Sequence, residues 1–284
     1  MIELAENRYG KSRVRLMKVT RSAGVHDLFD WTVEVLLRGD FAAAHKEGDN
    51  SRILATDTMK NTVYSLARRS SARSMEEFAK ELIDFLLERN AQVDSAEVSI
   101  RSALWKRLSV DGSPDPTTFM RGSAEEQTTR AERAQGGRFR VTSGLDHLAV
   151  LKTANSGFSG FIRDELTTLP ETDDRLLGTA MRSSWVYGRE PEDFGAVRNN
   201  IRETMLRTFA LHKSRSVQET MYAMGEAALN AVSAIDEIEL AMPNKHCLLV
   251  DLSRFGQDNP NEIFVPTDEP HGYIEARLRR RSEA

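Results

Sequence analysis

Residues 31–37, WTVEVLL, decide the fold class of this chain, because every second side chain in them is large and apolar. This period of two, running from Trp31 to Leu37, predicts a β-strand with one buried face. A shorter alternation at residues 13–16, RVRL, predicts another strand before it. The chain is therefore expected to begin with two strands that both need a core on one side.

Two helices are predicted after these strands. The first runs from about Thr58 to Arg69. The second opens with the capping box Ser74-Met75-Glu76-Glu77 and carries apolar residues, from Phe78 to Leu86, on one face. Residues 93–101 and 104–110 then predict a pair of strands. The order in the first half is two strands, two helices and two strands.

The second half repeats this order. Its predicted elements are strands at 145–152 and 182–187, helices at 194–212 and 217–232, and strands at 235–241 and 246–252. Residues 111–137 are rich in Gly, Pro, Ser, Thr and charge, and we expect a connector or a long mobile excursion there. The simplest packing is an α+β fold with an antiparallel sheet and helices on one face in each half. The halves are expected at residues 1–137, with the connector, and 138–284, with the C-terminal tail.

Composition excludes several classes of protein. With 284 residues, 40% of them apolar, the chain can bury a substantial core. Its net charge of -4 and its pI near 6.0 give no general attraction to nucleic acid or anionic lipid. There is no apolar stretch of membrane-spanning length and no secretory leader pattern, and the single cysteine, Cys247, rules out an internal disulfide. We expect a cytoplasmic protein with no nucleic-acid or membrane partner.

The common cofactor and metal motifs are missing from the sequence. It has no Gly-x-Gly-x-x-Gly after a strand, no P-loop, no His-Glu-x-x-His and no Cys-x-x-Cys. The six histidines are scattered, and the acidic run at residues 171–174 is typical of a solvated turn. We therefore expect neither a metal nor a bound cofactor.

One polar site is predicted from three distant segments. In residues 49–64, DNSRILATDTMKNTVY, the pair Thr56-Asp57 ends a short apolar run and opens a predicted helix. Tyr9-Gly10-Lys11 lies upstream and Asn244-Lys245-His246 lies downstream. These segments combine a lysine, a hydroxyl, an amide and an imidazole, which are groups suited to proton transfer.

Short segments along the chain together resemble the urate oxidase (uricase) family of bacterial type. They occur in the family's order and are YGK at 9–11 with Val14-Arg15, RGDF at 38–41, GDN at 48–50, TDT at 56–58, KNTVY at 60–64, VLK at 150–152, SGF at 156–158, GF at 160–161, RD at 163–164, TTL at 167–169, DR at 174–175, Gln218, TMY at 220–222, Met224, MPNKH at 242–246 and FGQDNPNE at 255–262. The ordered set is specific although each segment alone is weak. Residues 111–137 match little, and Leu166 and Pro170 stand where an aromatic and a polar residue are expected.

The resemblance implies a tandem tunnelling fold, with two β-β-α-α-β-β units in each chain. It also implies a homotetramer whose sheets close into barrels around a central tunnel. The active site would then form between subunits, with the side that holds Lys11 and Thr56 on one and the side from Phe158 to His246 on another.

The resemblance implies substrate-binding roles for Thr56 and for several residues of the second half. Arg175 would make two parallel hydrogen bonds to one edge of urate, and Gln218 would bind the opposite edge. Phe158 would stack on the purine plane, and Val217 would contribute a backbone contact. Taken singly, these residues have plainer roles, as a surface ion pair, a polar residue in a helical turn and core packing.

The resemblance also implies the catalytic roles. Lys11 and Thr56 would form a proton relay from urate, which His246 extends, and Asn244 with Thr56 would bind dioxygen above the purine plane. Asp57 would offer its backbone amide to urate, while its side chain has the plainer role of a helix cap. No cofactor is implied, because urate itself is the electron donor to dioxygen. The products would be 5-hydroxyisourate and hydrogen peroxide.

Two other functions stay open at this point. The chain could be a tunnelling-fold enzyme that acts on another purine or a pterin, since one fold carries several chemistries. It could also be an inactive purine-binding or scaffold relative. The presence of Lys11, Thr56 and His246 together argues against the first alternative, and the presence of Lys11 and Thr56 argues against the second.

Overall fold

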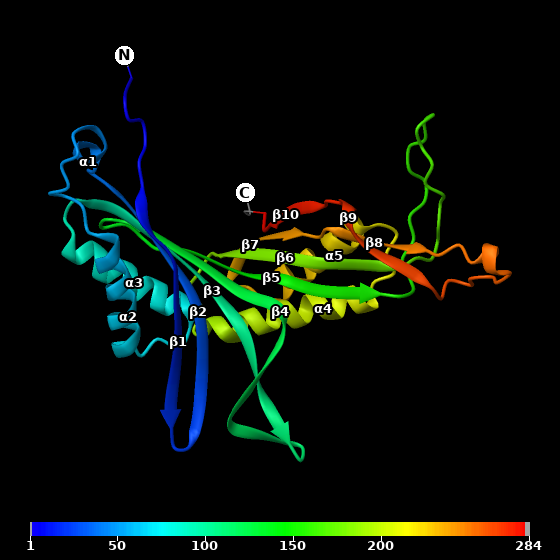
Figure 1. The fold of residues 1–284 in the computed structure, drawn as a ribbon, viewed down its shortest axis with the longest axis horizontal. Coiled ribbons are helices and arrows are strands. Elements are labelled where there is room, and N and C mark those ends of the chain that lie inside the picture. Colours follow the sequence, from blue (N-terminus) through cyan, green and yellow to red (C-terminus); the bar gives the residue numbers. More distant parts are fainter. Residues whose placement is uncertain (1, 282–284) are drawn as a thin grey trace. The chain divides into compact units, whose positions relative to one another are not determined.

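The computed structural model describes residues 2–281 of the chain. By their contacts these residues fall into two compact units, Met1–Gly144 and Leu145–Ala284. Each unit combines long antiparallel strands with helices (Figure 1). In each unit the order of the main elements is two strands, two helices and two strands, as the sequence predicts.

The first unit contains four long strands in the order β1-β2-β3-β4, with neighbouring strands antiparallel. Its elements are β1 (Tyr9–Ser22), β2 (Val25–Gly39), α1 (Ala42–Lys46), α2 (Thr56–Arg69), α3 (Met75–Arg89), β3 (Val93–Val110) and β4 (Ser113–Ala134). Helices α2 and α3 lie together against one face of these strands (Figure 1).

The alternation in β2 produces the predicted two-faced strand. Val33, Val35 and Leu37 are all 0% exposed, and they face the helices. The N-cap of the predicted capping box is confirmed at the start of α3, since the Ser74 hydroxyl accepts a hydrogen bond of 3.1 Å from the Glu77 amide. The Glu77 carboxylate accepts in return from the amide of Arg73, at 2.6 Å, one residue before the N-cap. Leu82 and the other apolar residues of the α3 stripe pack over the strands, which closes the core of this unit.

The prediction of a connector at residues 111–137 is wrong. Most of this segment is the strand β4, which forms a long hairpin with β3, and β3 itself continues without a break through residues 104–110. The turn is Asp111-Gly112, and both residues have positive φ, 50° and 81°. Asp-Gly is the preferred pair for a two-residue hairpin turn of this kind. The polar composition of β4 concealed the strand because much of its surface faces water.

The second unit begins with the same order of strands and helices and adds two further strands at its end. Its elements are β5 (Arg140–Lys152), which begins in the first unit, β6 (Leu177–Tyr187), α4 (Phe194–Leu211), α5 (Val217–Ala231), β7 (Ile235–Ala241), β8 (Asn244–Leu249), the short helix η1 (Ser253–Phe255), β9 (Phe264–Gly272) and β10 (Glu275–Arg279). The strand order is β5-β6-β7-β10, while β8 pairs with β6 and β9. Apolar residues of α4 and α5 pack against β6 and β7 around the buried Trp185.

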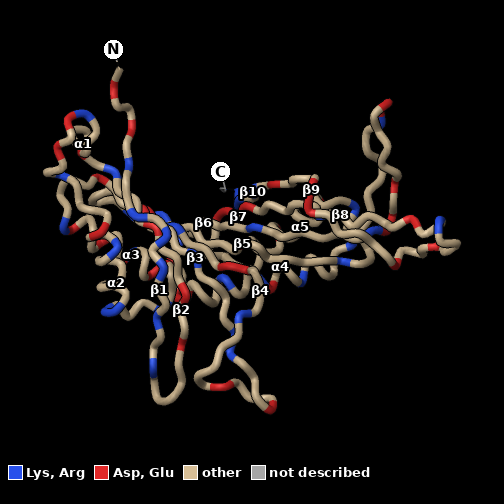
Figure 2. The backbone as a smooth tube through the Cα atoms, in the orientation of Figure 1, with Lys and Arg blue, Asp and Glu red and all other residues tan. Residues whose placement is uncertain are grey.

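Charged residues of both signs are interspersed along the strands and helices (Figure 2). Within residues 2–281, no helix is long and apolar enough to cross a membrane.

Gly10 is a point at which a single methyl group should be costly. A Cβ at this position would lie 1.8 Å from the carbonyl oxygen of Val35 on the neighbouring strand. Because this obstacle is backbone, we expect Gly10→Ala to lower the free energy of unfolding by about 1–3 kcal/mol. Urea unfolding measures the change. The matched control is Gly122→Ala, whose Cβ would meet only the flexible Lys106 side chain at 3.2 Å; equal stability of the two variants would contradict the prediction.

Candidate active site

Lys11 lies on the helix-covered face of the first unit. It pairs with Val35 across β1 and β2, and directly paired residues of an antiparallel sheet project to the same face. The side chain is partly buried rather than free in solvent. Its position beneath the helices brings it to the beginning of α2.

A β-bulge follows Lys11 and bends the edge strand. The register between β1 and β2 shifts between Lys11 and Val14, and Arg13 within this step has a φ of 58°. Bulges re-aim side chains and are common beside active sites. Here the bulge separates the end of β1 that carries Lys11 from the regular hairpin that follows.

Tyr9 joins β1 to the segment that begins α2. Its hydroxyl donates to the carbonyl of Leu54 at 3.2 Å and accepts from the amide of the same residue at 2.8 Å. Its ring lies edge-on against Phe41 at 4.7 Å, and burial raises the pKa of the phenol despite the opposing hydrogen bond from the Leu54 backbone. We call this pair of hydrogen bonds between Tyr9 and Leu54 the Tyr9 clamp. Lys11 lies two residues after Tyr9, and Thr56 lies two residues after Leu54, so the clamp holds their segments together.

The N-terminus of α2 is open toward a ligand. Thr56 is the first residue of the helix, and Ala55, at the N-cap, provides no side-chain hydrogen bond to it. The first amides of a helix have no intrahelical partner and attract negative charge. Asp57 does not act as the predicted side-chain cap, because its carboxylate accepts from the side chains of Lys60 and, at 3.0 Å, Asn61. The backbone of Thr56 and Asp57 is thus available to an anion.

The charges near Asp57 connect it to Lys11. The pKa of the Asp57 carboxyl is lowered chiefly by the hydrogen bond and charge of Lys60, and the charge of Lys11 adds to the effect. The first unit therefore brings together three of the predicted residues, Lys11, Thr56 and Asp57.

In the second unit, Phe158 lies in a loop held by backbone hydrogen bonds. Its amide donates to the carbonyl of Thr172 at 2.7 Å, and the reciprocal bond is 3.1 Å. The ring is half-buried and stacks on Phe161, with centroids 5.0 Å apart and planes 12° apart. Phe158 is therefore not a core residue, and its ring is part of the wall of an open groove of about 1040 Å³.

Arg175 is a half-buried cation without a counter-ion. Within the described residues it makes no ion pair with Asp173 or Asp174, and its Nε is buried without a hydrogen-bond partner. Burial lowers the pKa of the guanidinium, which lies 5.2 Å from the centroid of the Phe158 ring. An unpaired, desolvated guanidinium is costly in an isolated chain. Its planar fork beside an aromatic ring is suited to a flat ligand with adjacent acceptors.

Ser156 links these two residues to the start of α5. Its carbonyl accepts from the Arg175 amide at 2.7 Å, and it forms an isolated bridge with Ser214. Gly157 next to it donates to the carbonyl of Ser214 at 2.8 Å. Ser214 is followed closely by α5, so Phe158, Arg175 and the helix N-terminus are assembled around one short stretch of backbone.

The two predicted residues of α5 differ in exposure. Val217 is the first residue of the helix and is buried, whereas the side chain of Gln218 is exposed. Ser216 caps the helix by accepting from the Glu219 amide at 3.1 Å. The exposed amide of Gln218 therefore lies on a fixed first turn.

The carboxyl group of Glu219, in the first turn of α5, should make the stability of the folded protein depend on pH. Hydrogen bonds from the Arg215 side chain and backbone lower the pKa of its carboxyl from 4.5 to about 2. Because the pKa of the Glu219 carboxyl is depressed in the folded state, the ionised carboxylate stabilises the fold. This stabilisation is complete above about pH 4.5 and is lost as the pH falls toward about 2. We expect the difference in Tm between wild type and Glu219→Gln to shrink over this interval. Glu226→Gln, on the same helix, is the control, and a difference that stays constant with pH would contradict the prediction.

Asn244 and His246 lie two residues apart on β8, where the register against β9 shifts between them. Asn244 is 9% exposed and His246 is partly buried. Lys245 between them pairs with Gly178, which is three residues after Arg175. The topology of the second unit therefore places the β8 residues beside the strand that follows Arg175.

The structure thus assembles the predicted residues in two sets. Lys11, Thr56 and Asp57 belong to the first unit, and the other six belong to the second. Sequence reasoning did not single out the Tyr9 clamp or the Ser156–Ser214 bridge, which position these sets. In the described part of the chain, no group of three or more His, Cys, Asp or Glu side chains is placed to hold a metal ion.

The repeated strands and helices, with polar groups gathered at loops and helix N-termini, define an α+β protein of the tunnelling-fold class. The structure of the uricase from Arthrobacter globiformis is similar over 100% of this chain and 97% of that one, with a TM-score of 0.94 and 41% identity. A Bacillus sp. TB-90 urate oxidase structure shares the fold at 21% identity, with a TM-score of 0.84, 96% of this chain and 100% of that chain covered.

The sequence comparisons agree. The family model described as Uricase matches residues 7–132 and 141–275. The uricase of Arthrobacter globiformis is 42% identical over 98% of this chain and 90% of its own length, and that of Aspergillus flavus is 38% identical over 97% and 96%. The chain belongs to the uricase family.

Proposed function

We propose that the protein is a urate oxidase, an oxidoreductase that converts urate, dioxygen and water to 5-hydroxyisourate and hydrogen peroxide. The observation that carries the proposal is Arg175, whose half-buried guanidinium has no counter-ion and lies beside the ring of Phe158. A planar anion with a carbonyl next to a ring nitrogen supplies what this guanidinium lacks. Family membership supports urate as that anion.

Most of the urate-binding residues that we propose belong to the second unit. Arg175 would bind one edge of urate with two parallel hydrogen bonds, and Gln218 would bind the opposite edge through its exposed amide. Phe158 would cover the purine plane, and the backbone of Val217 would add a contact at the start of α5. The first amides of α2, at Thr56 and Asp57, would bind the anion from the other side.

The catalytic part would move protons. Lys11 would accept a proton from urate through the hydroxyl of Thr56, and His246 would extend the relay. The roles of Lys11 and Thr56 are supported by the Tyr9 clamp, which fixes the Lys11 segment to the start of α2. Asn244, together with Thr56, would hold dioxygen over the purine plane, and then the attacking water.

The overall reaction is balanced without a cofactor. Urate loses two electrons, dioxygen gains them together with two protons as hydrogen peroxide, and water adds to the oxidised ring. The protein would bind the anion flat, remove its protons and exclude bulk water. We therefore propose that neither a metal nor an organic cofactor is needed.

The two sets of residues belong to different units, and we propose that they meet at subunit interfaces of a homotetramer. The units would be tunnelling-fold repeats at about residues 1–137 and 138–284, and their sheets would close into barrels around a tunnel. A symmetric oligomer would repeat each shared site identically. The single free cysteine, Cys247, supports a reducing compartment, and we propose the cytoplasm.

An oxygen-electrode assay of the chelator-treated protein tests the proposal. Urate absorbance and hydrogen peroxide are followed in the same sample. Oxygen uptake equal to urate loss and peroxide release is the expected result. Saturable urate binding without oxygen uptake would indicate a purine-binding scaffold instead, and no urate binding would indicate another purine or a pterin.

A further inference from the structure

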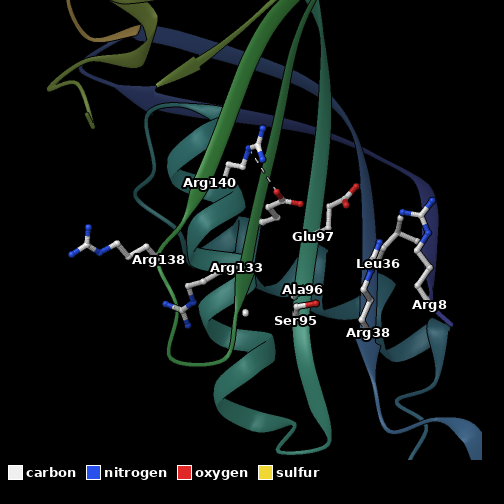
Figure 3. A pocket seen from close by; sticks show the side chains of 11 residues that line it. Arg8, Leu36, Arg38, Ser95, Ala96, Glu97, Arg133, Arg138 and Arg140 are labelled. Carbon is white, nitrogen blue, oxygen red and sulfur yellow. Dashed lines mark ion pairs between the residues drawn. The ribbon is translucent and has the colours of Figure 1, made fainter. Parts of the chain in front are cut away.

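A second pocket lies in the first unit, and nothing in the proposed reaction uses it. Its volume is about 330 Å³, and β2, β3 and β4 contribute side chains to it together with Arg8, which precedes β1 (Figure 3). This size is at the lower end of the range for small-molecule sites.

The pocket lies on the face of the strands that α2 and α3 do not cover. Leu36 pairs with Glu97, and Arg38 pairs with Ser95, so these four side chains share a face. Val35 and Leu37, which alternate with them, face the helices. Lys11 pairs with Val35, so the pocket and the Lys11 side chain lie on opposite faces of the strands. The pocket is therefore distinct from the first unit's part of the candidate active site.

The acidic side chains of the pocket already have partners. Glu97 accepts a hydrogen bond of 2.7 Å from Arg130. Glu132 lies 3.5 Å from Arg130 and 3.9 Å from Arg140. Their negative charge is therefore compensated within the sheet itself.

Arg8 and Arg38 have no such partner. Neither forms an ion pair or a hydrogen bond through its side chain with any of the residues 2–281. They extend from neighbouring positions at the same end of the pocket, on either side of Leu36 (Figure 3). Arg138, which likewise has no ion pair among the described residues, points away from them in the same view. Two like charges on one face repel each other unless an anion lies between them.

We propose that this pocket binds a small oxyanion, a phosphate or a carboxylate, between Arg8 and Arg38. A guanidinium binds either group through parallel N–H donors, and two guanidinium groups can enclose it from two sides. The hydroxyl of Ser95, which is paired with Arg38, adds a neutral donor. The pocket volume of about 330 Å³ limits the ligand to a small anion.

Isothermal titration with inorganic phosphate, and separately with acetate, tests the proposal against a chloride reference of equal ionic strength. We expect saturable binding of at least one oxyanion, weakened about tenfold or more in Arg38→Gln, since a hydrogen bond to a charged group contributes about 1.5–3 kcal/mol. Arg38→Lys keeps the charge and should lose part of the affinity, because the fork is absent. Arg121→Gln, an exposed residue of β4 outside the pocket, is the matched control and should bind like wild type.

The two arms of the titration identify the ligand class. Binding of phosphate alone assigns a phosphate site, and binding of acetate as well assigns a general oxyanion site. If Arg38→Gln does not fold, Arg8→Gln provides the same comparison, because Arg8 precedes β1 and lies outside the strands. No saturable binding of either anion, or equal binding by wild type and the folded arginine variant, would overturn the proposal. Because these readouts do not involve urate, they are independent of the proposed oxidase activity.

Discussion

Lys11→Met lowers kcat for urate oxidation by about 10²–10⁴-fold with little change in KM, if Lys11 is the proton acceptor of the relay. Methionine keeps an unbranched apolar stem, with sulfur in place of one methylene, and lacks the terminal amine. Lys11 is partly buried, and its charge reaches Asp57 in the first turn of α2, next to Thr56. Steady-state kinetics by urate absorbance, with KM and kcat determined separately, measure the effect.

The control for this prediction is Lys106→Met. Lys106 is an exposed lysine on β3, in the same unit but remote from the α2 segment in the sheet register. We expect it to retain wild-type turnover. A Lys11→Met protein that is folded and turns over urate as fast as the Lys106→Met control would refute the role of the amine.

Arg175→Lys is expected to have its main effect on urate binding. Lysine keeps the positive charge but loses the paired, coplanar donors, so we expect the dissociation constant for urate to rise about tenfold to a hundredfold. Arg175→Ala removes the charge as well and should weaken binding further. Equilibrium binding of urate under anaerobic conditions measures affinity without turnover.

Arg163→Lys is the matched control for this change. Arg163 is an exposed arginine of the same loop region, with its guanidinium 5.2 Å from the Phe161 ring and an ion pair of 3.8 Å to Glu171. Its replacement should leave urate affinity close to that of wild type. Equal affinity of Arg175→Lys and wild type would show that the buried guanidinium does not bind urate through its fork.

Much of the fold could be predicted because local patterns and tertiary packing agree here. The alternation from Trp31 to Leu37 corresponds to the buried face of β2, and Ser74 caps the start of α3 as expected. The prediction of α2 was two residues short, since the helix starts at Thr56 without a capping side chain. That uncapped start coincides with the proposed anion site.

The sequence of residues 111–137 has the composition of a loop but the turn residues of a hairpin, and the hairpin forms. Asp111-Gly112 is a strong hairpin signal, and it was hidden among Gly, Pro, Ser and Thr residues that usually indicate loops. A strand with extensive exposure, such as β4, lacks the apolar alternation by which buried strands are recognised.

The candidate site was predicted by resemblance, not by pattern alone. No period or spacing predicts that Arg175 is buried without a counter-ion, because this depends on the loop that Ser156 and Ser214 hold together. The Tyr9 clamp and the bulge after Lys11 are similarly products of long-range contacts. These features explain how the segments are positioned, while the roles of the side chains stay predictions.

Complementation between two inactive variants tests the central claim, that the Lys11 set and the Arg175 set are halves of one active site shared between subunits. Differently tagged Lys11→Met and Arg175→Ala chains are co-expressed, and oligomers carrying both tags are purified and assayed for urate oxidation. In a mixed oligomer, about a quarter of the sites would combine two unaltered halves, and we expect turnover to recover toward that fraction of wild type. Mixed oligomers as inactive as either parent would contradict a site shared between subunits.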